Sequence, residues 1–314
     1  MVKNRNRIKG AFVGLIFLFS LLLLSTAGQQ QKRPEVPYVP TPENVVAEML
    51  RLAEVNKDDV LYDLGCGDGR IVITAASQLG CRGVGIDIDP QRIKESRENA
   101  IQAGVEDRVE FFEMDLFEAE ISPATVVTLY LLSEVNIRLR PKLLRELRPG
   151  TVVVSHDFDM NSWKFDKSSF IEHRYDDYIP VVDTYLVDNY WDKHHLYLWI
   201  IPANVSGEWK WILPTISGKK QYRLKLEQEF QEVTGEAFQD SSLVPLDIKD
   251  GKIVGNKLQF FLESRIDGRK KKMHFEGFAK DHTMEGLVRI EGEPDSMEKW
   301  QAARAPSTMK PIDK

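Results

Sequence analysis

Cysteine is scarce in this chain, with two among 314 residues. Cys66 lies in a glycine-rich loop and Cys81 before an expected strand, and they do not suggest a disulfide framework. Positive charge is not in excess either, because 42 Lys and Arg face 48 Asp and Glu, which leaves a net charge of −6. The chain lacks the basic footprint of a nucleic-acid-binding protein, so no nucleic-acid partner is expected.

Long hydrophobic runs are also missing, apart from a short one near the N-terminus. Residues 11–24 are apolar, Lys and Arg precede them, and small residues follow at 25–28. The run is short for a spanning helix of about 20 residues, and the three-part pattern is typical of a secretory signal peptide. No cysteine directly follows the run, which excludes a lipoprotein signal. Residues 1–28 are predicted to be a signal peptide or N-terminal membrane anchor and residues 29–36 a linker.

This N-terminus predicts a protein that is membrane-anchored or exported. The positive residues before the apolar run place the rest of the chain outside. Contact with a membrane is expected through this segment alone, and the oligomeric state is left open.

A glycine-rich loop follows an apolar run that ends in an acid. Residues 60–64 are an expected strand that contains Asp63, and Gly65, Gly67 and Gly69 alternate through the loop before a helix. Glycines at alternate positions let the backbone approach a ligand where a Cβ would collide, and they permit positive φ. A strand, such a loop and a helix in this order indicate a nucleotide-type site at the carboxyl edge of a parallel sheet.

The spacing of this loop disfavours a dinucleotide. The dinucleotide fingerprint is G-x-G-x-x-G, whereas this loop reads G-x-G-x-G, with Asp63 before it and Asp68 inside it. Two carboxylates would repel a pyrophosphate, but they favour a ligand with an ammonium and a sulfonium. A nicotinamide-dependent oxidoreductase is therefore disfavoured. Residues 63–69 resemble the first motif of class I S-adenosylmethionine-dependent methyltransferases, which implies S-adenosyl-L-methionine as the cofactor.

A second apolar run begins at residue 83 and ends in the acids Asp87 and Asp89 before Pro90. Asp87 lies 24 positions beyond Asp63, which suits adjacent strands of one strand–helix–strand unit. We expect Asp87 to accept two hydrogen bonds from a ribose diol, with Asp89 as the alternative. The competing interpretation is that these acids only cap a helix that begins near Pro90.

Residues 109–116 predict a third strand and its exit. The resemblance implies that Asp115 meets the adenine amino group and that Met114 touches the ring, although ordinary core packing explains Met114 equally well. The predicted cofactor-binding residues are Thr41, Asp63, Gly65, Cys66, Gly67, Asp68, Gly69, Asp87, Ile88, Met114 and Asp115.

The segment before the loop has two interpretations. In residues 37–43, Thr41 suits a helix N-cap and Pro42 the first helical position. Alternatively, this segment folds over the methionine end of the cofactor.

Strands and helices alternate through the first half of the chain. Residues 126–132 and 151–155 are expected strands, and a helix between them has Pro141 in its first turn. Continuous apolar strands alternating with helices predict an α/β fold, a Rossmann-like doubly wound sheet of seven strands over residues 37–203. The resemblance covers residues 37–165. This part of the chain looks most like small bacterial methyltransferases and is also similar to the lysine methyltransferases that modify the ATP synthase c subunit.

The acceptor motif of nucleic-acid amino methyltransferases is absent. Residues 130–134 stand where Asn/Asp-Pro-Pro-Tyr is expected, which argues against adenine in DNA or RNA and leaves a protein lysine or a small molecule. Methyl transfer needs an aligned acceptor and, for an amine, uptake of a proton. Tyr130, Glu134 and Asp157 are the predicted catalytic residues, with His156 a further candidate nearby.

No metal site is predicted. His156 and Asp157 lack further ligands at a suitable spacing, and the adjacent side chains of His194 and His195 face opposite sides of a strand.

Helical periodicity is missing beyond residue 205. Short alternating segments recur instead, separated by turn signals such as those at 250–251 and 267–268. They predict an all-β antiparallel barrel over residues 204–304, with Trp300 as its plug and residues 305–314 as a tail. Residues 207–209 are similar to the opening of lipocalin-like barrels. Residues 159–192 are expected to be irregular and to complete the methyltransferase sheet and its acceptor side, and the basic run 269–272 is expected at a hairpin tip.

Two functions from different classes follow from these patterns. The first is methyl transfer from S-adenosylmethionine to an unidentified acceptor, a protein lysine or a small molecule. The alternative is an exported ligand-binding or scaffold protein with an inactive methyltransferase domain, because the signal-like N-terminus conflicts with a cofactor expected in the cytosol.

Overall fold

The computed structural model describes residues 34–175, 190–215, 218–239, 242–266, 269–293 and 297–313. Residues 36–314 form one compact unit. The predicted signal peptide or anchor lies outside the described residues. Among those that are described, no helix is both long and apolar enough to span a membrane.

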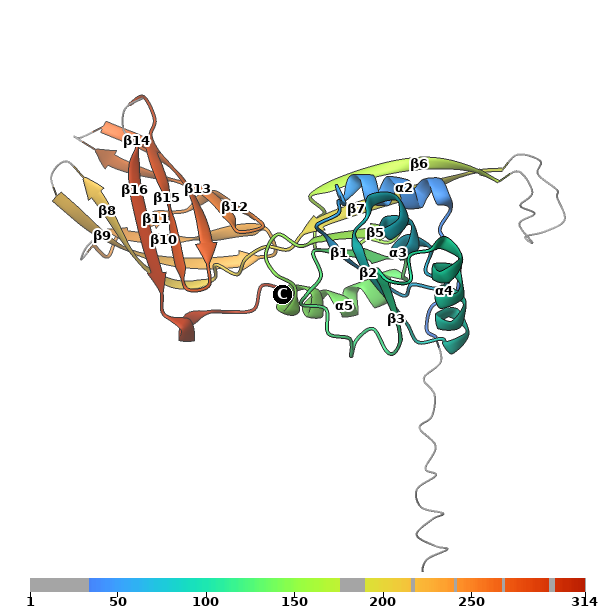
Figure 1. Cartoon of the computed structure of the whole chain (residues 1–314). Coiled ribbons are helices and arrows are strands. Elements are labelled where there is room, and N and C mark those ends of the chain that lie inside the picture. Colours follow the sequence, from blue (N-terminus) through green and yellow to red (C-terminus); the bar gives the residue numbers. More distant parts are fainter. Residues whose placement is uncertain are drawn as a thin grey trace, which may run out of the picture. The chain divides into compact units, whose positions relative to one another are not determined.

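The first sheet has seven strands in the order β3-β2-β1-β4-β5-β7-β6, and β7 is antiparallel to β5 (Figure 1). Strands β1 to β5 are parallel to their neighbours, which brings their carboxyl ends to one edge. The strands are β1 (Val60–Leu64), β2 (Arg82–Asp87), β3 (Val109–Glu113), β4 (Val126–Leu129), β5 (Val152–His156), β6 (Lys167–Tyr175) and β7 (Tyr190–Ile200).

Helices cover both faces of this sheet because its strands are apolar on both sides. Leu61 of β1 belongs to a core cluster with α2, α3 and α4, whereas Leu64 of the same strand belongs to a cluster with α5. The helices are α2 (Glu43–Leu52), α3 (Arg70–Thr74), which continues into the π-helix η2 (Ala75–Leu79), α4 (Pro90–Ala103) and α5 (Ser133–Glu146). The predicted doubly wound α/β sheet is confirmed.

Three local predictions about this half were wrong. Helix α5 begins at Ser133, so Pro141 lies inside it rather than in its first turn. Thr41 is not the N-cap of α2; Pro42 holds that position, and its carbonyl accepts the Val46 N–H. Residues 159–192 do complete the sheet as expected, but they are not irregular throughout, because they contain β6, which pairs with β7 along its whole length.

The second sheet closes into an eight-stranded antiparallel barrel. Its strand order is β10-β12-β13-β14-β15-β16-β8-β9, and pairing of β9 with β10 completes the ring, while β11 pairs with β10 beside it. The strands are β8 (Gly207–Thr215), β9 (Gly218–Glu229), β10 (Glu232–Gln239), β11 (Leu246–Asp247), β12 (Lys249–Val254), β13 (Lys257–Ile266), β14 (Arg269–Lys280), β15 (Thr283–Ile290) and β16 (Glu298–Arg304). The predicted barrel is confirmed.

Period-two alternation fills the barrel with large side chains. Trp211 packs against Phe275 at a ring distance of 4.5 Å and against Trp300 at 5.4 Å. Trp300 is 1% exposed and lies in this core, as its sequence pattern predicts. The segment expected to be a tail forms η3 (Pro306–Thr308), and Ile312 beyond it is buried.

Arg304, at the end of β16, is a buried cation that joins separate parts of the barrel. Its guanidinium donates to the carbonyl oxygens of Asn204 and Ser206 at 2.8 Å and of Asp281 at 2.9 Å. Its Cζ also lies 4.8 Å from the Trp209 ring centroid. The side chain therefore links the segment before β8 to the β14–β15 turn.

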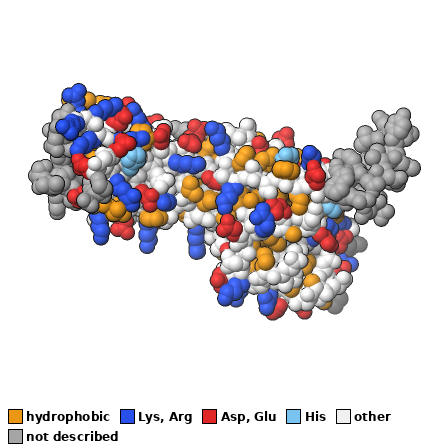
Figure 2. Space-filling model, turned by 90° about the horizontal axis from the view of Figure 1, so that it is seen from above, with side chains coloured by type: hydrophobic (Ala, Val, Ile, Leu, Met, Phe, Trp, Pro, Cys, Tyr) orange, Lys and Arg blue, Asp and Glu red, His pale blue; other side chains and the backbone are white. Residues whose placement is uncertain are grey.

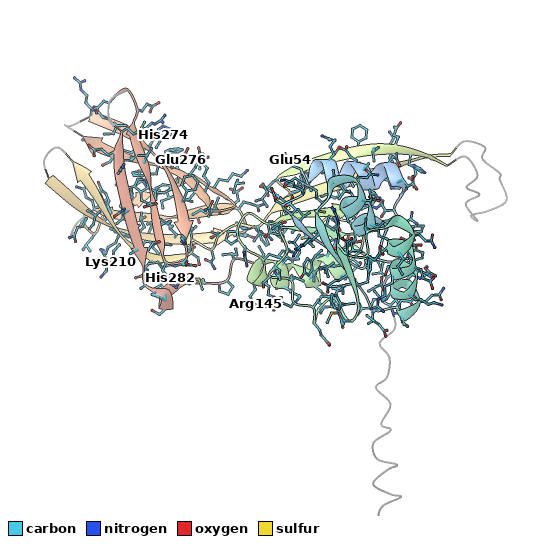
Figure 3. The ribbon with its side chains drawn as sticks, in the orientation of Figure 1. Glu54, Arg145, Lys210, His274, Glu276 and His282 are labelled. Atoms are coloured by element: carbon cyan, nitrogen blue, oxygen red, sulfur yellow. The ribbon has the colours of Figure 1, made fainter. Side chains whose placement is uncertain are left out.

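Replacing Arg304 with Met should lower the free energy of unfolding by about 2–5 kcal/mol, because the buried Ser206 carbonyl and the part-buried Asn204 and Asp281 carbonyls would lose their charged donor. Lys210→Met is the matched control: Lys210 is exposed on β8 (Figure 3), and its loss should change stability by less than about 0.5 kcal/mol. Urea unfolding of the full-length variants measures both values. Equal stability of the two variants would show that these contacts contribute nothing.

Candidate functional site

The glycine loop between β1 and α3 is held in left-handed backbone conformations. Gly65, Gly67 and Gly69 have φ values of +90°, +53° and +79°. The N–H groups of Gly65 and Cys66 both donate to the Ile86 carbonyl of β2, which fixes the loop against the neighbouring strand. Side chains at these positions would be strained, so glycine is required by geometry as well as by ligand approach.

Asp63 and Asp87 lie at the ends of the adjacent strands β1 and β2. Asp63 is 2% exposed and accepts a 2.8 Å hydrogen bond from the Thr128 hydroxyl. Burial raises the pKa of Asp63 to about 7, although the Thr128 bond acts in the opposite direction. Asp87 is half-buried, and its two oxygens accept the Gly67 and Asp89 N–H groups at 2.9 Å. Each oxygen retains a lone pair for a ligand.

The other predicted acids have defined partners. Asp68 forms a 2.7 Å ion pair with Arg70, which lowers the pKa of Asp68 against the opposing effect of burial. Asp89 caps α4 by accepting the Gln91 N–H at 2.8 Å, so the capping interpretation holds for Asp89 and not for Asp87. Asp115 accepts the Phe117 N–H at 2.9 Å.

The remaining predicted cofactor residues line the same edge. Met114 is 36% exposed directly after β3, and its N–H donates to the Asp87 carbonyl. Ile88 is half-buried after β2. Cys66 is buried, and burial raises the pKa of its thiol, which keeps the thiol neutral.

The segment before α2 is tied to the loop. Arg70 donates from Nη1 to the Thr41 carbonyl at 2.9 Å, and the Arg92 guanidinium lies 4.4 Å from the Tyr38 ring centroid. A Cβ on Gly67 would come within 2.5 Å of the Tyr38 ring. The Thr41 hydroxyl lies 3.3 Å from Nδ1 of His156, on the side of the site formed by β4 and β5.

Tyr130, His156 and Asp157 come together after β4 and β5. The ring centroids of Tyr130 and His156 lie 3.8 Å apart, and burial lowers the pKa of His156. Glu134, the other predicted catalytic residue, is exposed in the first turn of α5.

His194 is the member of this group that sequence reasoning missed. It is 3% exposed, and its Nδ1 lies 2.8 Å from Nε2 of His156 and 3.3 Å from Oδ2 of Asp157. The signal lay in the pairing of β5 with β7, which local sequence spacing does not show.

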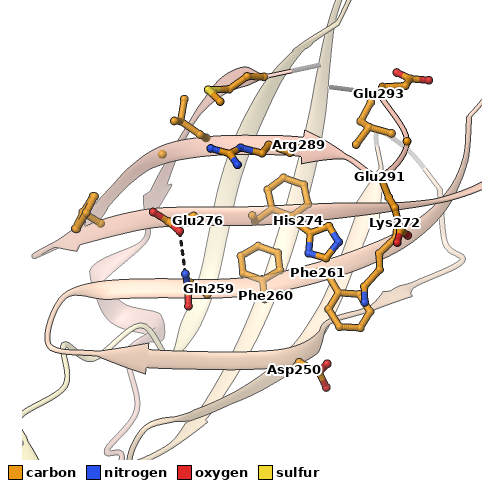
Figure 4. Close-up of a pocket in the computed structure, with 17 residues that line it drawn as sticks. Asp250, Gln259, Phe260, Phe261, Lys272, His274, Glu276, Arg289, Glu291 and Glu293 are labelled. Carbon is orange, nitrogen blue, oxygen red and sulfur yellow. Dashed lines mark hydrogen bonds between the residues drawn. The ribbon is translucent and has the colours of Figure 1, made fainter. Parts of the chain in front are cut away.

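The barrel has a pocket of its own, with a volume of about 1120 Å³ on the β13–β15 wall (Figure 4). Phe260 and Phe261 line it together with charged side chains, and two of these, Lys272 and Glu276, contact other residues of the pocket wall. Lys272 lies 3.5 Å from the Phe261 ring centroid, and Gln259 donates to Glu276 at 2.8 Å.

Positive and negative side chains are interspersed over the face of the molecule in Figure 2.

The strand order, the left-handed glycine loop and the acids that end β1 and β2 define a class I methyltransferase domain. The ANTKMT methyltransferase domain family matches residues 63–167. A protein-lysine N-methyltransferase of Saccharolobus islandicus is 53% identical over 131 residues, which cover 41% of this chain and 81% of that protein.

Two further proteins are similar to this chain over different shares of their length. The adenine nucleotide translocase lysine N-methyltransferase of Mus musculus is 31% identical over 156 residues, which cover 49% of this chain and 67% of that protein. A crystal structure of an RNA methyltransferase from Salinibacter ruber in complex with S-adenosyl-L-homocysteine is 52% identical, with a TM-score of 0.45 over 53% of this chain and 96% of that one.

The chain belongs to the class I S-adenosylmethionine-dependent methyltransferases, in the group that includes the protein-lysine N-methyltransferase of Saccharolobus islandicus. The predicted class and cofactor are confirmed. The individual cofactor contacts and catalytic residues stay predictions.

The raised pKa of Asp63 should make cofactor binding depend on pH. Because this carboxyl is protonated below about 7 in the folded protein, a cationic ligand must displace a proton there. We expect affinity to increase as pH rises from 5.5 to about 7, by up to about tenfold per unit, and then to level off. Calorimetry in buffers of different ionisation enthalpy should detect the released proton.

Asp63→Asn is the control for this effect, since the amide does not titrate. The same group also affects stability: the folded carboxyl holds its proton more tightly than the unfolded one, so stability should fall as pH rises from about 4 to about 7. An identical pH profile in both proteins would contradict the role assigned to Asp63.

Proposed function

We propose that this protein transfers a methyl group from S-adenosylmethionine to lysine side chains of a protein. The observation that carries the proposal is the 53% identity to the Saccharolobus islandicus protein-lysine N-methyltransferase over 81% of that protein. The ANTKMT family match and the Mus musculus relative support the same acceptor class.

The residues at the sheet edge suit the cofactor. The glycine loop holds a backbone in which any Cβ would collide with neighbouring side chains. Asp87 has lone pairs free for a ribose diol, and buried Asp63 suits a cationic ammonium. When bound, the cofactor supplies an electrophilic methyl group on a sulfonium.

The chain's own task is to present a neutral amine in line with that methyl group. A lysine ammonium must lose a proton before it can attack, and it must be aligned. Tyr130, whose ring centroid lies 3.8 Å from that of His156, is the residue proposed to orient the acceptor. Glu134, exposed at the start of α5, is the residue proposed to accept the proton, through water where the distance requires it.

A labelled-methyl assay tests this function. Full-length protein is incubated with labelled S-adenosylmethionine and extracts of the host, and the products are separated after protease or nuclease treatment. We expect label in protein, recovered as methyllysine after acid hydrolysis. Label that is removed by nuclease, or found only in small molecules, would contradict the lysine assignment while preserving the methyltransferase class.

Matched variants connect the label to this site. Asp87→Ala should abolish incorporation, whereas Asp89→Ala should preserve it because Asp89 caps α4. Absence of incorporation by the wild-type protein, together with a ligand retained by the barrel, would favour the ligand-binding or scaffold alternative.

We also propose that residues 1–28 anchor or export the protein. The support is their three-part sequence pattern of positive, apolar and small residues. Fractionation of the host, followed by mass spectrometry of the mature N-terminus, tests it. A soluble protein that retains residue 1 would contradict both forms of the proposal.

A further inference from the structure

His156, Asp157 and His194 bring three potential ligand atoms close together. Nε2 of His156 lies 2.8 Å from Nδ1 of His194 and 3.2 Å from Oδ2 of Asp157. The third side of this triangle, from His194 Nδ1 to Asp157 Oδ2, is 3.3 Å. At zinc–nitrogen distances of about 2.0–2.1 Å, tetrahedral geometry separates neighbouring ligand atoms by about 3.3 Å. The two edges that end at Asp157 Oδ2 match this spacing. The edge between the two imidazole nitrogens is 2.8 Å, a hydrogen-bond distance that a bound ion would widen.

The sheet register explains why these residues meet. His156 of β5 pairs with Leu196 of β7, so His194 is the diagonal neighbour on the same face as Leu196. His156 is 0% exposed and His194 3% exposed, which fixes both rings within the sheet. His195 is exposed on the opposite face of β7.

Outer contacts hold each group in place, as they do around protein metal sites. The N–H of His195 donates to Oδ1 of Asp157 at 2.8 Å, which leaves Oδ2 to face His156 and His194. The Thr41 hydroxyl lies 3.3 Å from Nδ1 of His156, leaving Nε2 directed inward. The polar contacts of His194 likewise pass through Nδ1, since its Nε2 has no hydrogen-bond partner among the described residues.

Asp157 also has an unusual backbone conformation. Its φ is +60°, a left-handed conformation that few non-glycine residues adopt. The Asp157 N–H donates to the His195 carbonyl at 2.7 Å, which secures this conformation across to β7. Strain of this kind is concentrated at functional sites.

We propose that His156, Asp157 and His194 bind a divalent transition-metal ion and that this ion is zinc. Two imidazoles and one carboxylate are a recurrent ligand set for such ions, and three protein ligands leave a fourth position open to water or an acceptor. A metal site could not be predicted from the adjacent His156 and Asp157, because the third ligand, His194, lies on a strand 38 residues further along the chain.

Metal content tests the proposal directly. Full-length protein is stripped with a chelator, incubated with zinc chloride, separated from free metal and measured by mass spectrometry. We expect about one zinc per chain in the wild-type protein. His194→Ala and Asp157→Asn should each weaken binding at least about 100-fold, since loss of an outer partner alone costs about 10–100-fold.

Two features keep the test decisive. Asn tolerates left-handed backbone and can still accept the His195 N–H, so Asp157→Asn should fold. His195→Ala is the control and should keep its zinc. His274 and His282 of the barrel half (Figure 3) are present in every variant, so their background is constant.

Cobalt substitution provides an independent readout. Tetrahedral Co²⁺ gives visible absorption bands, which we expect in the wild-type and His195→Ala proteins and not in His194→Ala. The proposal is overturned if the wild-type protein holds no more zinc than His194→Ala, or if His195→Ala loses as much as His194→Ala.

Discussion

Replacing Asp87 with Ala is expected to weaken S-adenosylmethionine binding by at least about 100-fold. A hydrogen bond to a charged group contributes about 1.5–3 kcal/mol, and 1.4 kcal/mol corresponds to tenfold in affinity. Two bonds to a ribose diol therefore account for this factor. The same carboxylate accepts the Gly67 N–H at 2.9 Å, so its removal also releases the glycine loop from the end of β2.

Calorimetry on the full-length protein measures this loss, with Asp89→Ala as the control. Asp89 is two residues away and is also an aspartate, but its side chain caps α4. Its removal should cost about 1 kcal/mol of stability and leave affinity within about threefold. If the two variants bind the cofactor equally well, Asp87 does not hold the ribose.

The cofactor side of the site was predictable because its signals are local. The apolar strands, the glycine loop and the acids all lie within short stretches whose order determines the parallel sheet. Parallel strands place their carboxyl ends at one edge, so Asp63 and Asp87 meet as a consequence of topology. The alternating pattern after residue 205 specified the barrel in the same way.

The part of the site formed by Thr41, His156 and His194 was less predictable, because these residues meet through long-range contacts between strands and segments. His194 reaches His156 only because β7 reverses direction beside β5. Thr41 has a sequence typical of an N-cap, yet its hydroxyl contacts His156, 115 residues later. Pro141 suggested a helix start, but the apolar positions Val135, Leu139 and Leu143 bury one face of a longer helix around it. Tertiary packing decided each of these against the local signal.

Gly69→Ala should lower the free energy of unfolding of the methyltransferase sheet and its helices by about 2–5 kcal/mol. The first part of the cost is conformational: φ is +79° at Gly69, and left-handed backbone costs an L-residue roughly 1–2 kcal/mol. The second part is steric, since a Cβ would lie 2.8 Å from both the Phe111 ring and Cβ of Ser96. Both side chains are buried, so neither can move away cheaply, and overpacking costs about 1–3 kcal/mol.

Gly104→Ala separates these two costs. Gly104 ends α4 with φ +66°, but a Cβ there would have nothing within 4 Å, so only the conformational cost of about 1–2 kcal/mol should remain. Hydrogen exchange of α3 and α4 amides under denaturant reports on this half of the chain rather than on the barrel. The difference between the variants measures how tightly α4 and β3 pack beneath the loop. Equal losses would mean that Phe111 and Ser96 yield freely, and the close approach at Gly69 would then have no energetic consequence.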